Sequence, residues 1–217
     1  MNKYYICALC NKKKLASECI DEFAISNKFS ICRLCASHLP YTHGDSSFPG
    51  TKYLSYVISS FYYRGYVKNS LRDYKFSYHT IFAEIMSHFM ADTLSKHNYI
   101  KDFDIIIPVP LSKKRFFQRG YNQSSLIAEK IAERFDIAYS ENILVRTRHT
   151  HKQSMLHGSD RISNVIDSFS SSSDLSGLRL VLFDDIFTTG NTLNQAAKAL
   201  RAAGAADVVG LTCAIVK

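Results

Sequence analysis

The sequence contains no long apolar run. None of its 217 residues lies in a stretch that approaches the roughly 20 apolar residues needed for a membrane-spanning helix. The first segment, MNKYYICALC, also lacks the continuous apolar region of a secretory signal peptide. We therefore expect a cytoplasmic protein that does not insert into a membrane.

Several common functional motifs are missing as well. No glycine-rich loop is followed by Gly-Lys-Ser/Thr, which excludes a Walker phosphate loop, and the glycine pattern of dinucleotide-binding folds is absent. The sequence has no internal repeat and no recognisable nucleophile triad. Any catalysis would therefore depend mainly on positioning and electrostatics.

The charge balance favours an anionic partner. The chain has 27 Lys and Arg against 19 Asp and Glu, a formal net charge of +8. Such a surplus suggests nucleic acid or phosphorylated metabolites without choosing between them. The six cysteines, without a secretory signal, favour metal binding or simple burial over a disulfide framework.

Four of the cysteines form two C-x-x-C pairs. These are Cys7, Cys10, Cys32 and Cys35, with residues 11–31 between the pairs. Two such knuckles can present four thiolates tetrahedrally to a structural Zn²⁺, and redox-active dithiols are the alternative. The segment HGDSSFPG, which ends at residue 50, has the composition of a connection. We predict a zinc-ribbon-like module over residues 1–50 and a second domain over residues 51–217.

The second domain has the pattern of an α/β fold. Its last part alternates an apolar strand, an amphipathic helix and a second strand, which predicts a mostly parallel sheet flanked by helices. The expected strands lie within residues 53–65, 102–111, 179–183 and 207–216, and the expected helices within 67–76, 79–97, 122–134 and 192–205.

Two adjacent carboxylates follow the apolar run of LVLFDDIFTTGNTL, residues 180–193. In an open parallel sheet, ligands bind beyond the carboxyl ends of the strands, where we expect Asp184 and Asp185. These carboxylates could accept hydrogen bonds from a sugar diol or hold a divalent cation. The alternative is an acidic strand end without a ligand.

The turn after the carboxylates leads into a helix. A helix N-terminus favours phosphate, because its first N–H groups lack intrahelical partners, and Gly190 would let the backbone approach closely. Thr188, Thr189 and Thr192 add hydroxyl donors. One loop could therefore bind both the hydroxyls and the phosphate of a ribose 5-phosphate.

This stretch resembles the phosphoribosyl pyrophosphate (PRPP) signature of type I phosphoribosyltransferases. Together with PVPLSKKRFFQRGYNQSSLIAEKIA, RTRHTHKQSMLHGSDRISNVIDSF and the cysteine-rich N-terminus, it is similar to the ComF family. The resemblance implies a type I phosphoribosyltransferase fold, a zinc module and a role in natural transformation by DNA uptake. It also implies Mg²⁺-dependent PRPP binding, with the following residues at the site: Asp184, Asp185, Thr188, Thr189, Gly190, Asn191 and Thr192.

The resemblance implies two further parts of a PRPP site. The loop after the strand IIIP would face pyrophosphate with Val109, Pro110, Leu111 and Ser112, although Pro110 has no N–H to donate. Arg119 and the neighbouring cations could neutralise the pyrophosphate together with Mg²⁺. A solvated basic loop is the alternative. The polar stretch 147–160 would form a lid, and Gln153 and Arg161 match family positions.

The segment KKRFFQRGYNQ permits a second interpretation. Cations interleaved with aromatic rings are typical of single-stranded nucleic acid binding. The candidates are Lys113, Lys114, Arg115, Phe116, Phe117 and Tyr121. Alternatively, the two phenylalanines pack in the core or between helices.

The sequence thus supports two hypotheses. The first is a phosphoribosyltransferase with an acceptor that the sequence does not identify, in which any base-recognising hood comes from residues before 100. The second is a non-enzymatic scaffold that binds incoming single-stranded DNA and contacts a DNA helicase or another protein of the uptake machinery. Both could hold together.

Overall fold

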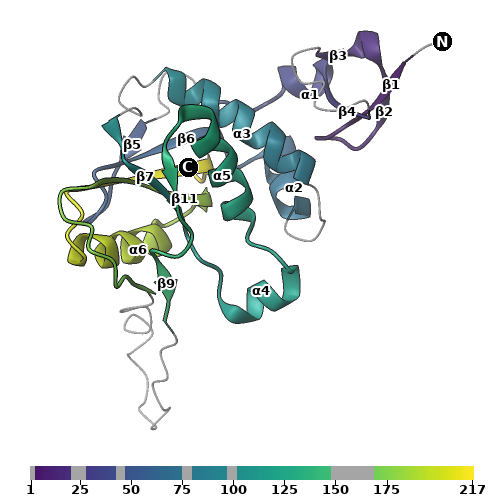
Figure 1. Cartoon of the computed structure of the whole chain (residues 1–217). Helices are drawn as coiled ribbons and strands as arrows, with labels where there is room; N and C mark the ends of the chain where they lie inside the picture. The colour runs from purple at the N-terminus through teal and green to yellow at the C-terminus, as the bar shows by residue number, and fades with distance from the viewer. Residues whose placement is uncertain (1–2, 21–27, 43–46, 75–79, 97–101, 148–168) are drawn as a thin grey trace, which may run out of the picture.

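A computed structural model describes residues 3–20, 28–42, 47–74, 80–96, 102–147 and 169–217 (Figure 1). These residues form a small N-terminal sheet, a larger sheet with helices on both faces, and a two-stranded ribbon. Within the described residues, no helix combines the length and apolar character needed to cross a bilayer.

The small sheet holds the cysteines. Its strands are β1 (Tyr4–Cys7), β2 (Lys13–Leu15), β3 (Cys19–Ile20) and β4 (Phe29–Cys32), in the order β2-β1-β4-β3. A 3₁₀ turn, η1 (Ala16–Glu18), precedes β3, and the short helix α1 (Arg33–Ser37) follows β4. We refer to residues 3–20 and 28–37 as the cysteine module.

The large sheet is mostly parallel, as the sequence predicts. Its order is β5-β6-β12-β11-β7-β8, and only the edge pairing of β5 with β6 is antiparallel. The strands are β5 (Ser47–Pro49), β6 (Tyr56–Tyr62), β7 (Ile105–Pro108), β8 (Ala138–Tyr139), β11 (Arg179–Phe187) and β12 (Asp207–Ile215).

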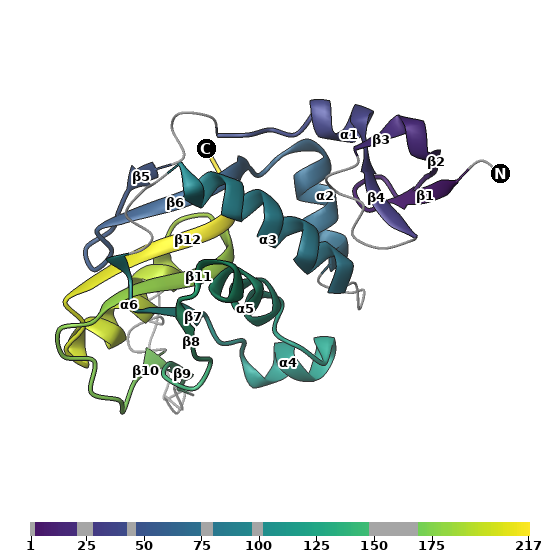
Figure 2. The same cartoon turned by 45° about the horizontal axis from the view of Figure 1, so that its top comes forward.

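Helices α3 (Thr80–Ser95) and α5 (Gln123–Phe135) cover one face of this sheet and α6 (Asn191–Ala202) covers the other (Figures 1 and 2). The chain's longer elements outside the cysteine module also include α2 (Gly65–Tyr74) and α4 (Lys113–Arg119), and the ribbon consists of β9 (Val145–Arg146) and β10 (Phe169–Ser170). Successive side chains of β11 point to opposite faces. Val181 and Phe183 therefore join the core with α3 and α5, whereas Leu180 and Leu182 join the core with α6.

The expected connection before residue 50 contributes to the large sheet. Tyr41 forms a bridge with Phe61, and β5 pairs with β6. The ring of Phe48 lies 6.5 Å from that of Tyr62, so an aromatic contact anchors a segment whose composition indicates a loop. The division of the chain at residue 50 stays a prediction, with residues 47–49 paired to the second domain.

Candidate functional site

The two adjacent carboxylates lie at a step in the large sheet. β11 pairs with β7 only as far as Phe183, opposite Pro108, but continues along β12 to Phe187. Asp184 and Asp185 therefore lie inside β11, rather than after it, at the point where β7 has already ended. The longer ladder with β12 is the reason that the strand extends beyond its predicted end.

Both carboxylates are half-buried and face a polar environment. The Oδ1 atom of Asp184 accepts a hydrogen bond from Ser124 Oγ at 3.3 Å and another from the Asp185 N–H at 2.9 Å. Ser124 is buried in the first turn of α5, so this helix fixes the orientation of the first carboxylate. Neither aspartate is enclosed in the apolar core.

A cavity of about 160 Å³ opens beside these carboxylates. We call it the polar cavity. Its lining residues are Val109, Pro110, Leu111, Arg115, Arg119, Gln123, Ser124, Arg146, Asp184, Asp185 and Thr192. Acids from β11 and cations from α4 and β9 thus meet around one space, next to the first turn of α6.

The turn into α6 requires glycine. Gly190 has φ +75°, and a Cβ atom there would lie 2.7 Å from Cζ of Phe187. As the N-cap of α6, Gly190 offers no side chain to cap the N–H groups of the first turn. Thr192 lines the polar cavity, and its neighbours Thr188, Thr189 and Asn191 are exposed.

Two partly buried arginines supply positive charge. Burial lowers the pKa of Arg119, and the negative charge of Asp185 partly opposes this effect. Burial also lowers the pKa of Arg146, helped by Arg115 and opposed by Asp184. Guanidinium groups nevertheless stay charged in proteins. The polar cavity therefore presents cations that could neutralise an anionic ligand.

Some residues of the polar cavity were not predicted. Arg146 lies far before the aspartates in the chain. It opens the segment RTRHTHKQSMLHGSDRISNVIDSF, in which the sequence assigns it no role, and the folding of β9 brings it to the cavity. Arg115 is predicted both as one of the cations near pyrophosphate and as a nucleic-acid contact, and it lines the polar cavity. Ser124 and Gln123 were also missed, although they follow the Arg-Gly-Tyr-Asn run directly. Gln123 Oε1 accepts a hydrogen bond from Arg119 at 2.8 Å.

The predicted pyrophosphate loop contributes only in part. The N–H of Val109 donates to Phe183 O at 2.8 Å, so the sheet already uses that donor. Ser112 is the N-cap of α4, and its Oγ accepts from the Arg115 N–H. Pro110 has no N–H. Leu111 also lines the polar cavity, and none of these contacts uses its N–H group.

The structure contradicts the core interpretation of the two phenylalanines on α4. Phe116 is 50% exposed and Phe117 is 85% exposed, and Lys113 and Lys114 beside them are exposed too. The reason is that α4 projects away from the other helices (Figure 1). Tyr121 differs, because it packs against the core and its OH donates to Tyr74 O at 2.6 Å.

The predicted lid residues Gln153 and Arg161 lie outside the described residues. Their placement and roles therefore stay predictions.

The four cysteines of the C-x-x-C pairs come together. The Sγ atoms of Cys7, Cys10, Cys32 and Cys35 all lie within 4.8 Å of one another. A tetrahedral Zn²⁺ with Zn–S bonds of about 2.3 Å needs sulfurs about 3.8 Å apart, so the cluster fits such an ion after small adjustments. This cluster could hold a metal.

Local hydrogen bonds favour thiolate at one of these positions. Burial raises the pKa of Cys7, but backbone hydrogen bonds from Cys32, Cys10 and Leu9 outweigh it, so the pKa is lowered. His38 is not part of the cluster, because its Nδ1 contacts Leu34 O at 2.8 Å.

The two remaining cysteines are buried outside the cluster. Cys213 lies in the core, with its Sγ 3.5 Å from Met90 Sδ. Cys19, whose role the sequence leaves open, pairs with Cys32 in the ladder between β3 and β4. Burial raises its pKa.

Comparison with known proteins agrees with this geometry. A family model described as a phosphoribosyl transferase domain matches residues 122–217, which include both aspartates and the turn into α6. This match and the mostly parallel sheet define a type I phosphoribosyltransferase fold with a cysteine cluster at its N-terminal end.

The curated relatives narrow the assignment. Competence protein F of Haemophilus influenzae is 39% identical over 108 residues, which cover 48% of this chain and 47% of that protein. Competence protein ComFC of Bacillus subtilis is 34% identical over 156 residues, covering 70% of this chain and 60% of the relative. DNA utilization protein YhgH of Salmonella typhi is 35% identical over 105 residues, covering 48% of this chain and 46% of that protein.

The chain thus spans about half of these relatives' length. It belongs to the ComF family, in the phosphoribosyltransferase superfamily.

Solved structures include similar chains at low identity. The glutamine PRPP amidotransferase of B. subtilis is 21% identical, with a TM-score of 0.41, over 60% of this chain and 26% of that chain. Purine phosphoribosyltransferase from Pyrococcus horikoshii is 17% identical, with a TM-score of 0.39, over 61% of this chain and 73% of that one. The assignment of fold does not depend on these weak similarities.

Proposed function

We propose that the polar cavity binds PRPP together with Mg²⁺. The observation that carries this proposal is that one cavity is lined by the adjacent carboxylates, by three arginines and by Thr192 of the α6 N-terminus. Each of these groups suits a different part of PRPP: the ribose diol, the pyrophosphate and the 5-phosphate.

The ribose and its 5-phosphate would lie along β11 and α6. Asp184 and Asp185 would accept hydrogen bonds from the two ribose hydroxyls. The 5-phosphate would accept them from the first N–H groups of α6 and from the hydroxyls of Thr188, Thr189 and Thr192. Gly190 shapes the turn that leads into this helix, because its φ is positive and a Cβ atom there would lie 2.7 Å from Phe187 Cζ.

The pyrophosphate would lie toward α4 and β9. Arg115, Arg119 and Arg146 could pair with its oxygens, because arginine forms bidentate hydrogen bonds with phosphate. Asp184 and Asp185 would hold Mg²⁺ directly or through water, since it prefers oxygen ligands, and the ion would supply further positive charge beside the pyrophosphate. These cations would stabilise pyrophosphate as a leaving group.

We further propose that the chain acts in competence, as the names of its relatives indicate for those proteins.

Transfer of the phosphoribosyl group would form a bond from an acceptor nitrogen to C1 of the ribose as the C1–O bond to pyrophosphate breaks, with inversion at C1. The described residues leave the acceptor unidentified.

Calorimetric titration with PRPP and Mg²⁺ tests the binding. We expect binding by the wild type and a loss of at least about 100-fold in affinity for Asp184→Asn combined with Asp185→Asn, since two charge-assisted contacts are removed. The matched control, Asp92→Asn with Asp102→Asn, removes two exposed carboxylates outside the cavity. Unchanged binding by the first variant would refute this site.

Release of pyrophosphate tests turnover. Each nucleobase and single-stranded DNA would be added to the chain with PRPP and Mg²⁺, and pyrophosphate would be measured over time. Release that depends on one acceptor, and on both aspartates, identifies a phosphoribosyltransferase. PRPP binding without release for any acceptor would indicate a PRPP-responsive binding protein.

The exposed face of α4 favours a second function, the binding of single-stranded DNA. Phe117 is 85% exposed and Phe116 is 50% exposed, and cations flank both rings. Bases could stack on these rings while Lys113 and Lys114 contact phosphates. This proposal fits the name of the DNA utilization relative. A DNA helicase or another protein of the uptake machinery would be the partner that receives the strand.

Strand-binding measurements over a range of salt concentrations test this function. Affinity should fall steeply with salt, because neutralised phosphates release counterions. Phe116→Ala with Phe117→Ala should reduce affinity at least about fivefold, given about 1–3 kcal/mol for each stacked base. Leu34→Ala removes an exposed apolar side chain elsewhere and is the control. Equal loss in both variants, or loss in neither, would exclude α4 as the stacking surface.

A further inference from the structure

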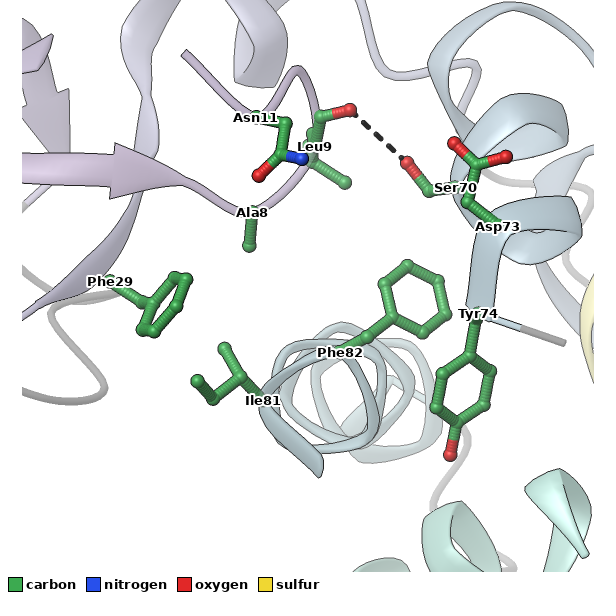
Figure 3. A pocket seen from close by; sticks show the side chains of 9 residues that line it. All are labelled: Ala8, Leu9, Asn11, Phe29, Ser70, Asp73, Tyr74, Ile81 and Phe82. Carbon is green, nitrogen blue, oxygen red and sulfur yellow. Dashed lines mark hydrogen bonds between the residues drawn. The ribbon is translucent and has the colours of Figure 1, made fainter. Parts of the chain in front are cut away.

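A second cavity lies between the cysteine module and the helices of the large sheet (Figure 3). It has a volume of about 210 Å³ and differs in lining from the polar cavity. Ala8 and Asn11 come from the first cysteine knuckle, Phe29 from β4, Asp73 from α2, and Phe82 from α3. We call it the interface cavity. The PRPP proposal makes no use of it.

The walls of the interface cavity are held in place from both sides. Ser70 Oγ of α2 donates to Leu9 O of the knuckle at 3.3 Å, and both residues are buried. Leu9 lies between Cys7 and Cys10, so a metal in the cysteine cluster would fix this wall. On the other side, the ring of Phe82 packs against the ring of Tyr74, with their centroids 4.7 Å apart. The interface cavity is therefore lined by packed residues of the cysteine module on one side and of helices α2 and α3 on the other.

The lining combines flat apolar surfaces with polar groups at one edge. Figure 3 shows the rings of Phe29 and Phe82 on opposite sides of the open space, with the side chains of Asn11 and Asp73 along its upper edge. Asp73 is exposed, and its Oδ1 lies 3.6 Å from Arg72 Nε, an exposed pairing of little energetic value. A flat ring with hydrogen-bonding groups at its edge matches this arrangement.

Size narrows the choice of ligand. Pockets for drug-sized molecules usually measure about 300–1,000 Å³, so the interface cavity suits a single ring system. The carboxylate of Asp73 disfavours an anion at the polar edge. Lys28 Nζ lies 5.5 Å from the ring centroid of Phe29, which puts a cation beside the outer wall. A base inside the cavity, with its phosphate toward this lysine, satisfies all of these features.

The carboxylate also discriminates between bases. An exocyclic amino group offers N–H donors, which the carboxylate of Asp73 can accept. In uracil and thymine the ring N–H is flanked by two carbonyl oxygens, which would face the carboxylate unfavourably. We propose that the interface cavity binds a nucleobase with an exocyclic amino group, from either a free nucleotide or a single strand.

Titrations of the metal-loaded full chain without PRPP test this proposal independently of the PRPP site. The probes are adenosine, cytidine and uridine monophosphates, and single strands of deoxyadenosine and of thymidine with equal length. We expect adenosine or cytidine monophosphate to bind at least about tenfold more tightly than uridine monophosphate, since a charged hydrogen bond contributes about 1.5–3 kcal/mol. Preference for the deoxyadenosine strand over its mononucleotide identifies a strand as the source of the base, and the reverse identifies a free nucleotide.

A methyl resonance gives a readout at the site itself. Ile81 lines the interface cavity, so the ring current of a bound base should shift its δ1 methyl signal. Asp73→Asn should weaken binding at least about tenfold and remove the preference against uridine. Asp92 is an exposed acid on α3 that pairs with Lys96. The variant Asp92→Asn is therefore the matched control and should bind as the wild type does.

A third variant, Phe29→Ala, tests the apolar wall of the interface cavity. Phe29→Ala should reduce affinity at least about fivefold through lost stacking, and it is informative only with wild-type metal content. Asp73→Asn changes an exposed side chain and leaves the packed walls intact, so it tests the proposal even where Phe29→Ala does not fold. Binding with no shift of the Ile81 signal, equal affinity of Asp73→Asn, or no binding of any probe would each overturn the proposal.

Discussion

The two sheets of this chain are stabilised by different means. The sheet of the cysteine module has strands of two to four residues, and three of its four clustered cysteines are buried. The large sheet has two central strands of nine residues, and Leu180, Leu182 and Phe183 are fully buried between helices. Short strands bury little apolar surface, so the module should depend on a metal, whereas the large sheet should depend on packing.

Loss of one metal ligand should have the largest effect, because it should remove the metal that stabilises the cysteine module. Cys32→Ser should abolish metal binding and unfold the cysteine module, because structural zinc contributes about 10–16 kcal/mol in isolated zinc fingers. The large sheet should still unfold cooperatively, at a lower temperature, since the two regions share a core. Metal content and thermal unfolding measure the two effects.

Cys19→Ser provides the control for that variant. Cys19 is as buried as Cys32 and lies beside it in the ladder, but it is outside the cluster. It should therefore retain the metal. Equal metal content in Cys32→Ser and the wild type, or equal metal loss in both variants, would mean that the module is not organised by these four thiolates.

A cavity in the core of the large sheet should have the next largest effect. Leu182→Ala removes a fully buried side chain of β11 and should lower the free energy of unfolding by about 2–5 kcal/mol. Metal content should stay at the wild-type level. Denaturant titration measures the loss, and Val145→Ala, where the side chain is 54% exposed, is the control. Loss of metal from Leu182→Ala would contradict the view that the metal stabilises the cysteine module and core packing stabilises the large sheet.

Substitution of the glycine at the α6 N-terminus should have a moderate effect. Gly190→Ala combines a positive φ with a close contact to Phe187, and should cost about 1–3 kcal/mol. Gly177→Ala is a matched control, because Gly177 has φ +79° and no atom within 4 Å of the added Cβ. Only Gly190→Ala should also weaken PRPP binding. If both variants lose equal stability and bind PRPP alike, the close approach at Gly190 has no role.

An exposed ion pair in the cysteine module should have the smallest effect. A hydrogen bond from the Leu15 N–H, and then one from Lys14, lower the pKa of Glu18. A lowered pKa stabilises the fold above the unfolded value of about 4.3, and this contribution disappears as pH falls through the folded value. Glu18→Gln should therefore lower the melting temperature slightly near neutral pH and not in acid.

The pH dependence supplies the check on that small effect. Glu133→Gln, which changes an exposed side chain on α5, should leave the melting temperature unchanged at both pH values. A larger loss for Glu18→Gln in acid than near neutral pH would contradict the assigned sign.

The regular parts of the fold follow from local sequence patterns. The alternation of strand, helix and strand at the C-terminal end predicted β11, α6 and β12, since apolar periodicity and helix-ending glycine act over short distances. The local pattern ends this strand at residue 183, short of its true end at Phe187, because Asp184 and Asp185 have low strand preference on their own. Pairing with β12, which the local pattern does not reveal, overrides that preference.

The candidate sites follow from the sequence only where one segment supplies them. The acid pair and Gly190 lie on a single segment, and the cysteines have a regular spacing, so both groups were predictable. Arg146 enters the polar cavity from a separate ribbon. The interface cavity joins Asn11 to Phe82, which lie far apart in the chain, and the exposure of Phe117 depends on how α4 projects. Such features require the tertiary structure.

A crystal structure of the chain with PRPP and Mg²⁺ tests the central claim most directly. We predict the 5-phosphate at the N-terminus of α6, the ribose hydroxyls within hydrogen-bonding distance of Asp184 and Asp185, and the pyrophosphate beside Arg119 and Arg146. A PRPP molecule bound elsewhere, with the polar cavity filled only by solvent, would contradict the account.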